Sequence, residues 1–206
     1  KCLVQLHKPT RGSVEYQGVN ILELKKGQMK NIKKEIQMVF QDPFSSLDPR
    51  MTAGKLVEEP MIVHKTEKDR KSRSKKALQL LQTVGLDIQH VHRYPHEFSG
   101  GMKQRAIIAM ALACNAEILI ADEPTTALDV TIQAQIMKLL KEIQTKTNTS
   151  VLLITHDLAL VGENADYVSV MYAGRIVETG PAKEFFANPK HPYSTALLRS
   201  LPSKRF

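Results

Sequence analysis

Three short, largely apolar runs constrain the fold of this 206-residue chain more than any other feature. They are Gln37–Phe40, Ile118–Ala121 and Val151–Ile154, and we interpret them as buried strands. Strands that are apolar on both faces are typical of parallel sheets covered by helices. The segment between the second and third runs has one apolar face at helical spacing, formed by Ile132, Ile136, Leu139, Leu140 and Ile143. This strand–helix–strand order predicts an α/β protein.

The middle of the chain follows a different pattern. Residues 43–115 are charged and helical in periodicity, without a convincing strand. Within them, Ser74–Val84 has an apolar helical face and is followed by Gly85, a typical helix stop. We therefore predict a helical subdomain, residues 43–115, inserted into an α/β core that is formed by residues 1–42 and 116–206.

Composition and charge exclude several classes of protein. The longest apolar run, Ala106–Cys114, is far shorter than the roughly 18 to 20 residues that a membrane span needs. The net charge is +8, and much of it lies in residues 65–76, where a solvated helix face is one interpretation. This basic stretch contains no aromatic residue on which bases could stack, so nucleic acid is not an expected partner. The two cysteines, Cys2 and Cys114, lack the spacing of metal ligands.

Two adjacent acids, Asp122 and Glu123, directly follow one of the predicted strands. The carboxyl ends of the strands are where α/β proteins bind their ligands. In nucleotide hydrolases, a first acid at this place organises Mg²⁺ and the next can polarise the attacking water. Acids also end strands simply as solvated caps, so this motif alone leaves both interpretations open.

Other polar residues occupy comparable positions. Ser99, Gly100 and Gly101 directly precede a helical run, where a hydroxyl and backbone N–H groups face an anion and the helix dipole attracts it. The alternative is an ordinary serine N-cap. Gln41 and His156 each follow a predicted strand, and for each the alternative is an ordinary polar side chain.

Taken together and in this order, these residues resemble the nucleotide-binding subunit of an ABC transporter over essentially the whole chain. The resemblance implies a P-loop NTPase-like ABC nucleotide-binding domain. It implies that Gln41 is the Q-loop glutamine, which senses Mg²⁺ and the attacking water and faces the membrane subunit. It further implies that Asp122 is the Walker B aspartate for Mg²⁺, Glu123 the catalytic glutamate and His156 the switch histidine.

The segment Phe98–Gln104 is similar to the signature motif of that family. Through it and the D-loop, the resemblance implies contacts to ATP by Ser99, Gly100, Gly101, Gln104 and Asp129. The signature contacts reach the γ-phosphate that is bound on an opposing subunit. Met102 stands where many members have Gln, which leaves the Ser-Gly-Gly sequence intact. ATP and Mg²⁺ are the implied cofactors.

Three longer segments resemble one branch of the family, the importers of oligopeptides, dipeptides and nickel. They are an extended Q-loop at Gln41–Met51, the signature region Tyr94–Met102, and a C-terminal motif at His191–Leu198. This resemblance implies an ATP-hydrolysing subunit that powers import of peptides or nickel. The implied partners are integral-membrane permease subunits, a second ABC ATPase subunit and, indirectly, an extracytoplasmic substrate-binding protein. The implied location is the cytoplasmic face of the cell membrane.

One departure from the family concerns its phosphate loop, because the motif G-x-x-x-x-G-K-[ST] is absent. Lys1–Leu6 resembles the helix that directly follows that loop, so we expect a fragment or a truncated gene product with weak or no ATPase activity of its own. A non-catalytic regulatory half is therefore an alternative. A soluble ABC ATPase of DNA repair or translation is another, although only 57 residues separate Gln41 from Ser99, too few for the long coiled coils of repair members.

Overall fold

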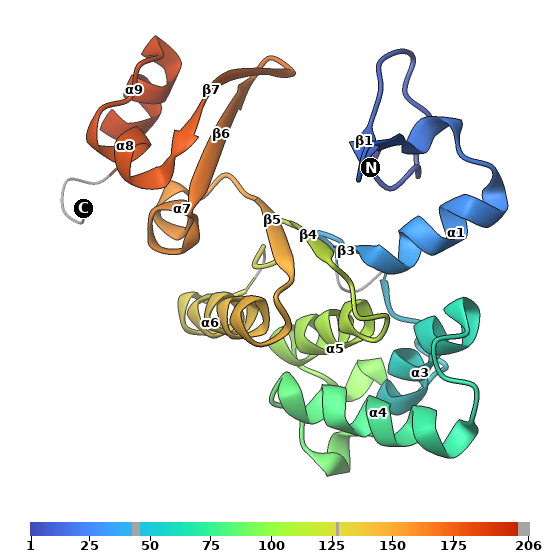
Figure 1. The fold of residues 1–206 in the computed structure, drawn as a ribbon. Helices are drawn as coiled ribbons and strands as arrows, with labels where there is room; N and C mark the ends of the chain where they lie inside the picture. Colours follow the sequence, from blue (N-terminus) through green and yellow to red (C-terminus); the bar gives the residue numbers. More distant parts are fainter. Residues whose placement is uncertain (43–45, 127, 202–206) are drawn as a thin grey trace. The chain divides into compact units, whose positions relative to one another are not determined.

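The computed structural model describes residues 1–42, 46–126 and 128–201, which form parts of two compact units, Lys1–Ile154 and Thr155–Phe206 (Figure 1). Residues 43–45 of the predicted Q-loop segment therefore lie outside the described residues. The helices and strands in chain order, with η for 3₁₀ helices, are β1 (Glu15–Tyr16), β2 (Val19–Asn20), η1 (Ile21–Glu23), α1 (Lys26–Glu35), β3 (Ile36–Val39), α3 (Ala53–His64), α4 (Arg70–Thr83), η2 (Ile88–His90), η3 (Pro95–Glu97), α5 (Gly100–Leu112), β4 (Ile118–Asp122), α6 (Val130–Thr147), β5 (Ser150–Ile154), α7 (Leu158–Asn164), β6 (Tyr167–Tyr172), β7 (Arg175–Pro181), α8 (Ala182–Ala187) and α9 (Pro192–Arg199).

The first unit is built on a parallel sheet in the order β3–β4–β5. Ile118 of β4 pairs with Ile36 on one side and with Ser150 on the other. Leu119 and Ala121 of the central strand are fully buried, as strands covered on both faces should be. The three predicted strands are thus confirmed, and α6 follows β4 as the periodicity predicts.

Between β3 and β4 the chain is helical, and residues 46–115 contain no strand. Helices α3, α4 and α5 pack on one another, with Leu56, Leu81 and Ile108 fully buried. Helix α4 ends before Gly85, whose φ of +78° is readily adopted only by glycine. The predicted helical subdomain, residues 43–115, falls inside the first unit, and the boundary between the two units at Ile154 falls inside the predicted α/β core. The limits of the helical subdomain therefore stay a prediction.

The N-terminal residues correct one expectation. Lys1–Leu6 forms turns, not a helix, and Gln5 has a φ of +53°. One helical turn is costly to nucleate, and Pro9 disfavours helical backbone just beyond it. Next come the two-residue strands β1 and β2, joined by Gln17 and Gly18, both at positive φ as a tight hairpin turn requires. The sequence analysis did not predict this hairpin.

The second unit contains the antiparallel pair β6–β7 and helices α7, α8 and α9. Its small core is formed by Val168, Val170, Ala182 and Phe185. The carboxylate of Glu178 on β7 accepts hydrogen bonds from the backbone N–H groups of Lys190 (2.8 Å) and His191 (2.9 Å), just before α9. In neither unit is any described helix long and apolar enough to cross a membrane.

Candidate functional site

The two acids predicted from the sequence lie where the central strand of the sheet ends. Asp122 is the last residue of β4, opposite Ile154 of β5. Glu123 follows with a φ of +47°, an uncommon backbone conformation for a residue with a side chain. Its N–H donates a 2.8 Å hydrogen bond to the carbonyl of Ile154, which continues the pairing of β4 with β5. Pairing with the neighbouring strand therefore helps to hold this strained turn in place.

Two side chains converge on the carboxylate of Glu123. The Gln41 amide donates a 2.7 Å hydrogen bond from Nε2 to Glu123 Oε2, across 82 positions of sequence. The Thr126 hydroxyl donates to the same oxygen over 2.9 Å. Gln41 thus lies beside Glu123, and Thr126 is a contact that the sequence analysis missed. Its position three residues after Glu123, across a tight turn, is the signal that could have identified it.

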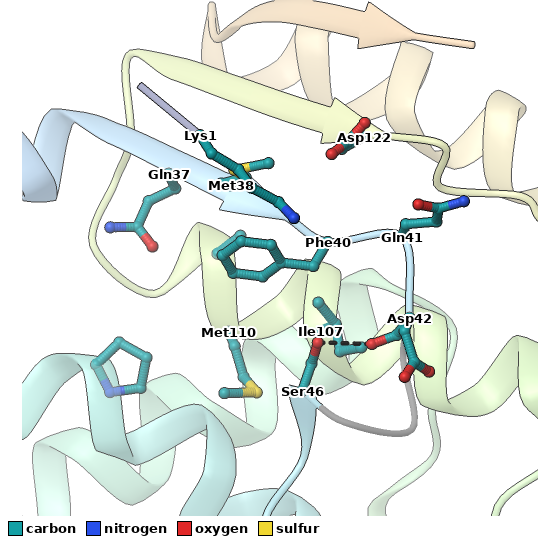
Figure 2. Close-up of a pocket in the computed structure, with 12 residues that line it drawn as sticks. Lys1, Gln37, Met38, Phe40, Gln41, Asp42, Ser46, Ile107, Met110 and Asp122 are labelled. Carbon is teal, nitrogen blue, oxygen red and sulfur yellow. Dashed lines mark hydrogen bonds between the residues drawn. The ribbon is translucent and has the colours of Figure 1, made fainter. Parts of the chain in front are cut away.

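A cavity of about 490 Å³ adjoins this cluster. Figure 2 shows Asp122 and Gln41 at one end of it, where strands β4 and β3 finish. Elsewhere the lining is mostly apolar, with contributions from Met38, Phe40, Pro60, Ile107, Met110 and Ala111. Lys1, Gln37 and Ser46 add polar groups away from the sheet edge, so Asp122 and Gln41 are not the cavity's only polar lining among the described residues.

The predicted signature residues form the start of helix α5. Ser99 is exposed and is the N-cap, because its Oγ accepts a 3.3 Å hydrogen bond from the N–H of Met102. The hydroxyl proton can still be donated to a ligand. Gly101, by contrast, is buried, and so is Gln104, whose side chain is 2% exposed. Because of this burial, Gln104 lies inside the fold and not on the exposed helix start. Its Nε2 has no hydrogen-bond partner among the described residues.

The remaining predicted residues begin two other helices. Asp129 is the N-cap of α6 and accepts a 2.9 Å hydrogen bond from the N–H of Ile132. It is exposed, as is Val130 beside it. His156 is an exposed residue of the second unit, immediately before Asp157, the N-cap of α7. The contacts of the first unit thus bring together Gln41, Glu123 and Thr126.

The donor atoms suit the two implied cofactors to different degrees. Magnesium prefers oxygen ligands and usually takes only one or two carboxylates, with phosphate oxygens and waters completing the octahedron. Asp122 with Gln41 fits that demand, and the described residues contain no cluster of three or more His, Cys, Asp or Glu that could hold a metal alone. For ATP, the start of α5 offers N–H groups and a hydroxyl to one phosphate. The lysine-bearing phosphate loop is not in the sequence.

Two family models match the chain. The model for ABC transporters matches residues 1–126, and the model for the C-terminal region of oligopeptide/dipeptide transporters matches residues 177–206. The first contains Gln41, the signature residues and both acids, and the second contains Glu178 and His191–Leu198.

Transport proteins from several bacteria are also similar to this chain in sequence. The oligopeptide transport ATP-binding protein of Bacillus subtilis (strain 168) is 52% identical over 197 residues, which cover 94% of this chain and 54% of that protein. The dipeptide transport ATP-binding protein of Lactococcus lactis subsp. cremoris (strain MG1363) is also 52% identical, over 93% of this chain and 56% of that protein. The chain thus spans little more than half the length of these relatives.

Solved structures resemble the fold as well. A dimeric ATP-binding cassette in a post-hydrolysis state, bound to ADP and Pi, matches with a TM-score of 0.77 and 31% identity, over 88% of this chain and 78% of that one. A component of the cbiONQ ABC transporter complex of Clostridium perfringens matches with a TM-score of 0.80 and 28% identity, over 91% and 72% of the two chains.

Proposed function

The chain belongs to the ABC transporter family, and on that basis we propose that it is the ATP-hydrolysing subunit of an importer of peptides. The observation that carries this proposal is the cluster at the end of β4, where Gln41 and Thr126 hold the carboxylate of Glu123 next to Asp122. The choice of peptides is supported by the C-terminal match at residues 177–206 and by relatives named for oligopeptide and dipeptide transport. Nickel is the alternative cargo in this proposal.

In this proposal, ATP and Mg²⁺ are the cofactors, and Gln41 acts on both the catalytic carboxylate and the metal. Glu123 accepts a proton from the attacking water, and the hydrogen bonds from Gln41 and Thr126 fix the direction of its carboxylate. Asp122 and Gln41 would hold Mg²⁺ through their side-chain oxygens, and the ion would neutralise charge on the phosphates during transfer. By its position in the family motif, His156 takes the role of the switch histidine in this proposal.

The start of α5 acts on a different nucleotide. We propose that Ser99, Gly100 and Gly101 contact the γ-phosphate of ATP bound on a second ABC subunit, with Asp129 at the same seam. Exposed Ser99 and the N–H groups of the first turn support this role, since helix starts attract anions. Gln104 can contribute only if the helix start opens, because its side chain is buried.

The other partners in this proposal are integral-membrane permease subunits, which place the protein at the cytoplasmic face of the cell membrane. A substrate-binding protein on the outer side participates indirectly. Selectivity for the cargo then lies in those subunits and not in this chain. Co-purification with the permease subunits tests the assignment against a soluble ABC ATPase, which would be recovered without them.

A second experiment addresses the missing phosphate loop. We expect the 206-residue chain alone to bind Mg-ATP poorly and to hydrolyse it near background, because phosphoryl transfer depends on the backbone cradle and lysine of that loop. The chain is titrated with labelled ATP and assayed for phosphate release, beside a chain extended at the N-terminus by a phosphate loop. Micromolar binding with sustained turnover by the 206-residue chain would contradict this expectation. No turnover by the extended chain would favour a non-catalytic regulatory half.

A further inference from the structure

Helices α5 and α6 touch at their first turns. A Cβ atom added to Gly101 would lie 2.6 Å from Cγ2 of Ile132, closer than two carbon atoms approach one another. A Cβ on Gly100 would lie 3.2 Å from Leu128 Cδ2, which a flexible side chain can accommodate. Glycine at position 101 therefore permits the close packing of α5 on α6. This requirement is separate from any contact of the glycine N–H groups with phosphate.

Arg105 extends the same contact. It follows Gly101 by four residues and so lies on the same face of α5, as Gln135 follows Ile132 by three on α6. Arg105 Nη2 donates a 3.0 Å hydrogen bond to Gln135 Oε1. The two helices are thus joined one turn further along by a polar bridge.

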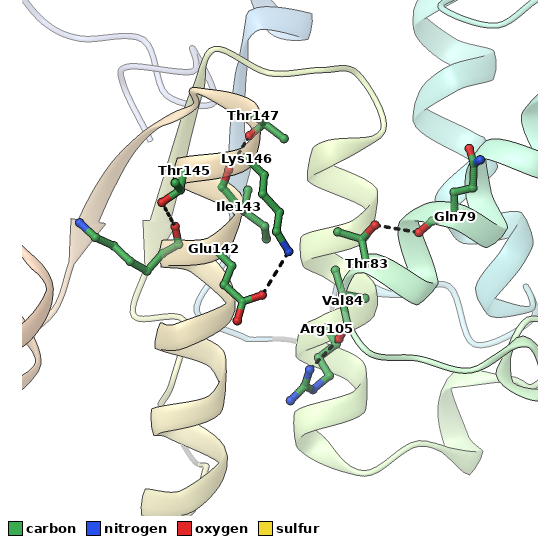
Figure 3. Close-up of polar contacts among 10 residues, drawn as sticks. Gln79, Thr83, Val84, Arg105, Glu142, Ile143, Thr145, Lys146 and Thr147 are labelled. Carbon is green, nitrogen blue, oxygen red and sulfur yellow. Dashed lines mark hydrogen bonds and ion pairs between the residues drawn. The ribbon is translucent and has the colours of Figure 1, made fainter.

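The same guanidinium also holds the end of α4. Arg105 Nη1 donates a 2.6 Å hydrogen bond to the carbonyl of Val84, the C-cap of α4 (Figure 3). A cation at a helix C-terminus is favourable, because the last carbonyl groups carry partial negative charge. A Cβ on Gly85 would lie 2.9 Å from Nη1, so glycine there leaves room for the guanidinium.

Between these helices lies a cavity of about 260 Å³, lined by the end of α4, by Arg105 and by residues of α6 that include Gln135 and Lys138. Arginine suits this place because its planar group offers several N–H donors in fixed directions. Lysine, with a single ammonium group, cannot reproduce this planar pair of donors. Arg105 therefore links α4, α5 and α6 through one side chain.

We propose that Arg105 is a positioning residue that clamps the start of α5 against the start of α6, so that Ser99 and Asp129 are presented together. The existence of this clamp does not depend on the proposed function. Only its purpose does, which is to let both helix starts contact the same partner subunit. Both N-cap side chains are exposed, and each accepts the N–H of the residue three positions on. The two helix starts then respond as one unit to a ligand.

Amide hydrogen exchange tests the clamp in the 206-residue chain without any nucleotide. The reporters are the amides of Lys103 and Gln133, which bond to the carbonyls of Ser99 and Asp129. Arg105→Ala and Gln135→Ala, the latter at an exposed position, should each speed the exchange of these two amides about tenfold. Loss of the hydrogen bond makes local opening of the helix starts less costly, and exchange occurs from the opened state.

The double variant should add little to either single variant, because both remove one bridge. Arg105→Lys should exchange as fast as Arg105→Ala, because lysine cannot form both hydrogen bonds. Gln135→Glu should exchange as slowly as the unaltered chain, because a carboxylate also accepts a hydrogen bond from the guanidinium. Lys138→Ala is the matched control, a cation of the same cavity outside the clamp, and should leave the rates unchanged. Additive effects, or acceleration no greater than in the rest of the chain, would overturn the proposal.

A second readout separates this inference from the proposed function. In the chain extended by a phosphate loop, Arg105→Ala should weaken ATP-driven association with a second subunit about tenfold, with ATP binding to the monomer unchanged. Equal loss of both would overturn the positioning role. If the unaltered extended chain does not associate with ATP at all, the proposed function fails, and the exchange data still decide whether the clamp exists.

Discussion

The start of α5 and the end of β4 are built in different ways. At the start of α5, the exposed serine, the two glycines and the hydrogen bond from Met102 to Ser99 all come from four consecutive residues. At the end of β4, the contacts to Glu123 come from Gln41 and Thr126, and Ile154 holds its backbone. One site is local, and the other is assembled from three separate segments.

This difference separates what each site needs in order to work. A local site exists as soon as its helix forms, and an anion can then find its N–H groups. An assembled site exists only while the sheet keeps β3, β4 and β5 in register. We therefore expect substitutions at the assembled site to alter chemistry, and substitutions at the local site to alter contact with a partner.

The largest effect is expected at the assembled site. In the chain extended by a phosphate loop, Glu123→Gln should slow phosphate release by about 10² or more, the scale of a lost general base. ATP binding, followed by titration with labelled nucleotide, should be unchanged. The exposed Glu163→Gln on α7 is the control and should keep normal turnover. Normal turnover in Glu123→Gln would remove Glu123 from this role.

At the local site, Ser99→Arg should weaken ATP-driven dimerisation of the same extended chain by at least about tenfold, or 1.4 kcal/mol. The bulky cation occupies the space that the γ-phosphate needs, whereas binding of ATP to the monomer is preserved. Analytical ultracentrifugation with and without ATP measures the association. Ser99→Asn separates the two causes, since asparagine keeps the N-cap. If monomer binding falls equally, Ser99 belongs to its own nucleotide pocket.

The two glycines divide the local site into a packing part and a ligand part. Gly101→Ala should lower the free energy of unfolding by about 1–3 kcal/mol, because its Cβ would overlap Ile132. Gly100→Ala should be neutral or raise it by up to about 1 kcal/mol, since alanine restricts the unfolded chain. Urea unfolding of the two variants measures the difference. Equal values would mean that α5 and α6 do not pack as closely as the structure has them.

A smaller effect is expected from the second hydrogen bond on Glu123. Thr126→Val keeps the side-chain shape but removes the donor to Oε2, so turnover of the extended chain should fall about five- to tenfold, the equivalent of one hydrogen bond. Thr145→Val serves as control, because the Thr145 hydroxyl bonds only to the preceding turn of its own helix in the contacts described. Unchanged turnover in Thr126→Val would show that the Thr126 hydroxyl does not direct the carboxylate.

The smallest effect concerns an assembled contact without a proposed role in catalysis. Burial raises the pKa of Glu178, but the N–H donors of Lys190 and His191, the Ser194 hydroxyl and the charge of His191 together outweigh it, so that the pKa lies below its ordinary value. The contact therefore stabilises the second unit at neutral pH and is lost as pH falls through this lowered pKa. Glu178→Gln should have a slightly lower melting temperature than the unaltered chain at pH 7. The melting temperatures of the two chains, measured against pH, should converge in acid. A gap that persists in acid would exclude the carboxylate's charge as its cause.

Much of this arrangement was predictable from the sequence. Apolar runs located β3, β4 and β5, and Gln41 and Glu123, which follow β3 and β4, meet where those strands end. Serine before two glycines marked the start of α5, because an N-cap bond spans only three residues and so is written in local sequence. Lys1–Leu6 was one exception, since so short a run forms too few helical hydrogen bonds to offset the cost of nucleation, and the β1–β2 hairpin was another.

Only the tertiary structure decided how the distant pieces meet. The bond from Gln41 to Glu123 crosses 82 positions, and it depends on the parallel register of β3 with β4. The positive φ of Glu123 is held by the carbonyl of Ile154 on the next strand, which no local pattern reveals. Likewise, the sequence marked Gly101 as a ligand contact, and the structure added that Ile132 leaves no room for a side chain there. The physical reason is the same in each case: a residue's type and spacing report its local bonds, whereas its neighbours in space follow from how the sheet and helices pack.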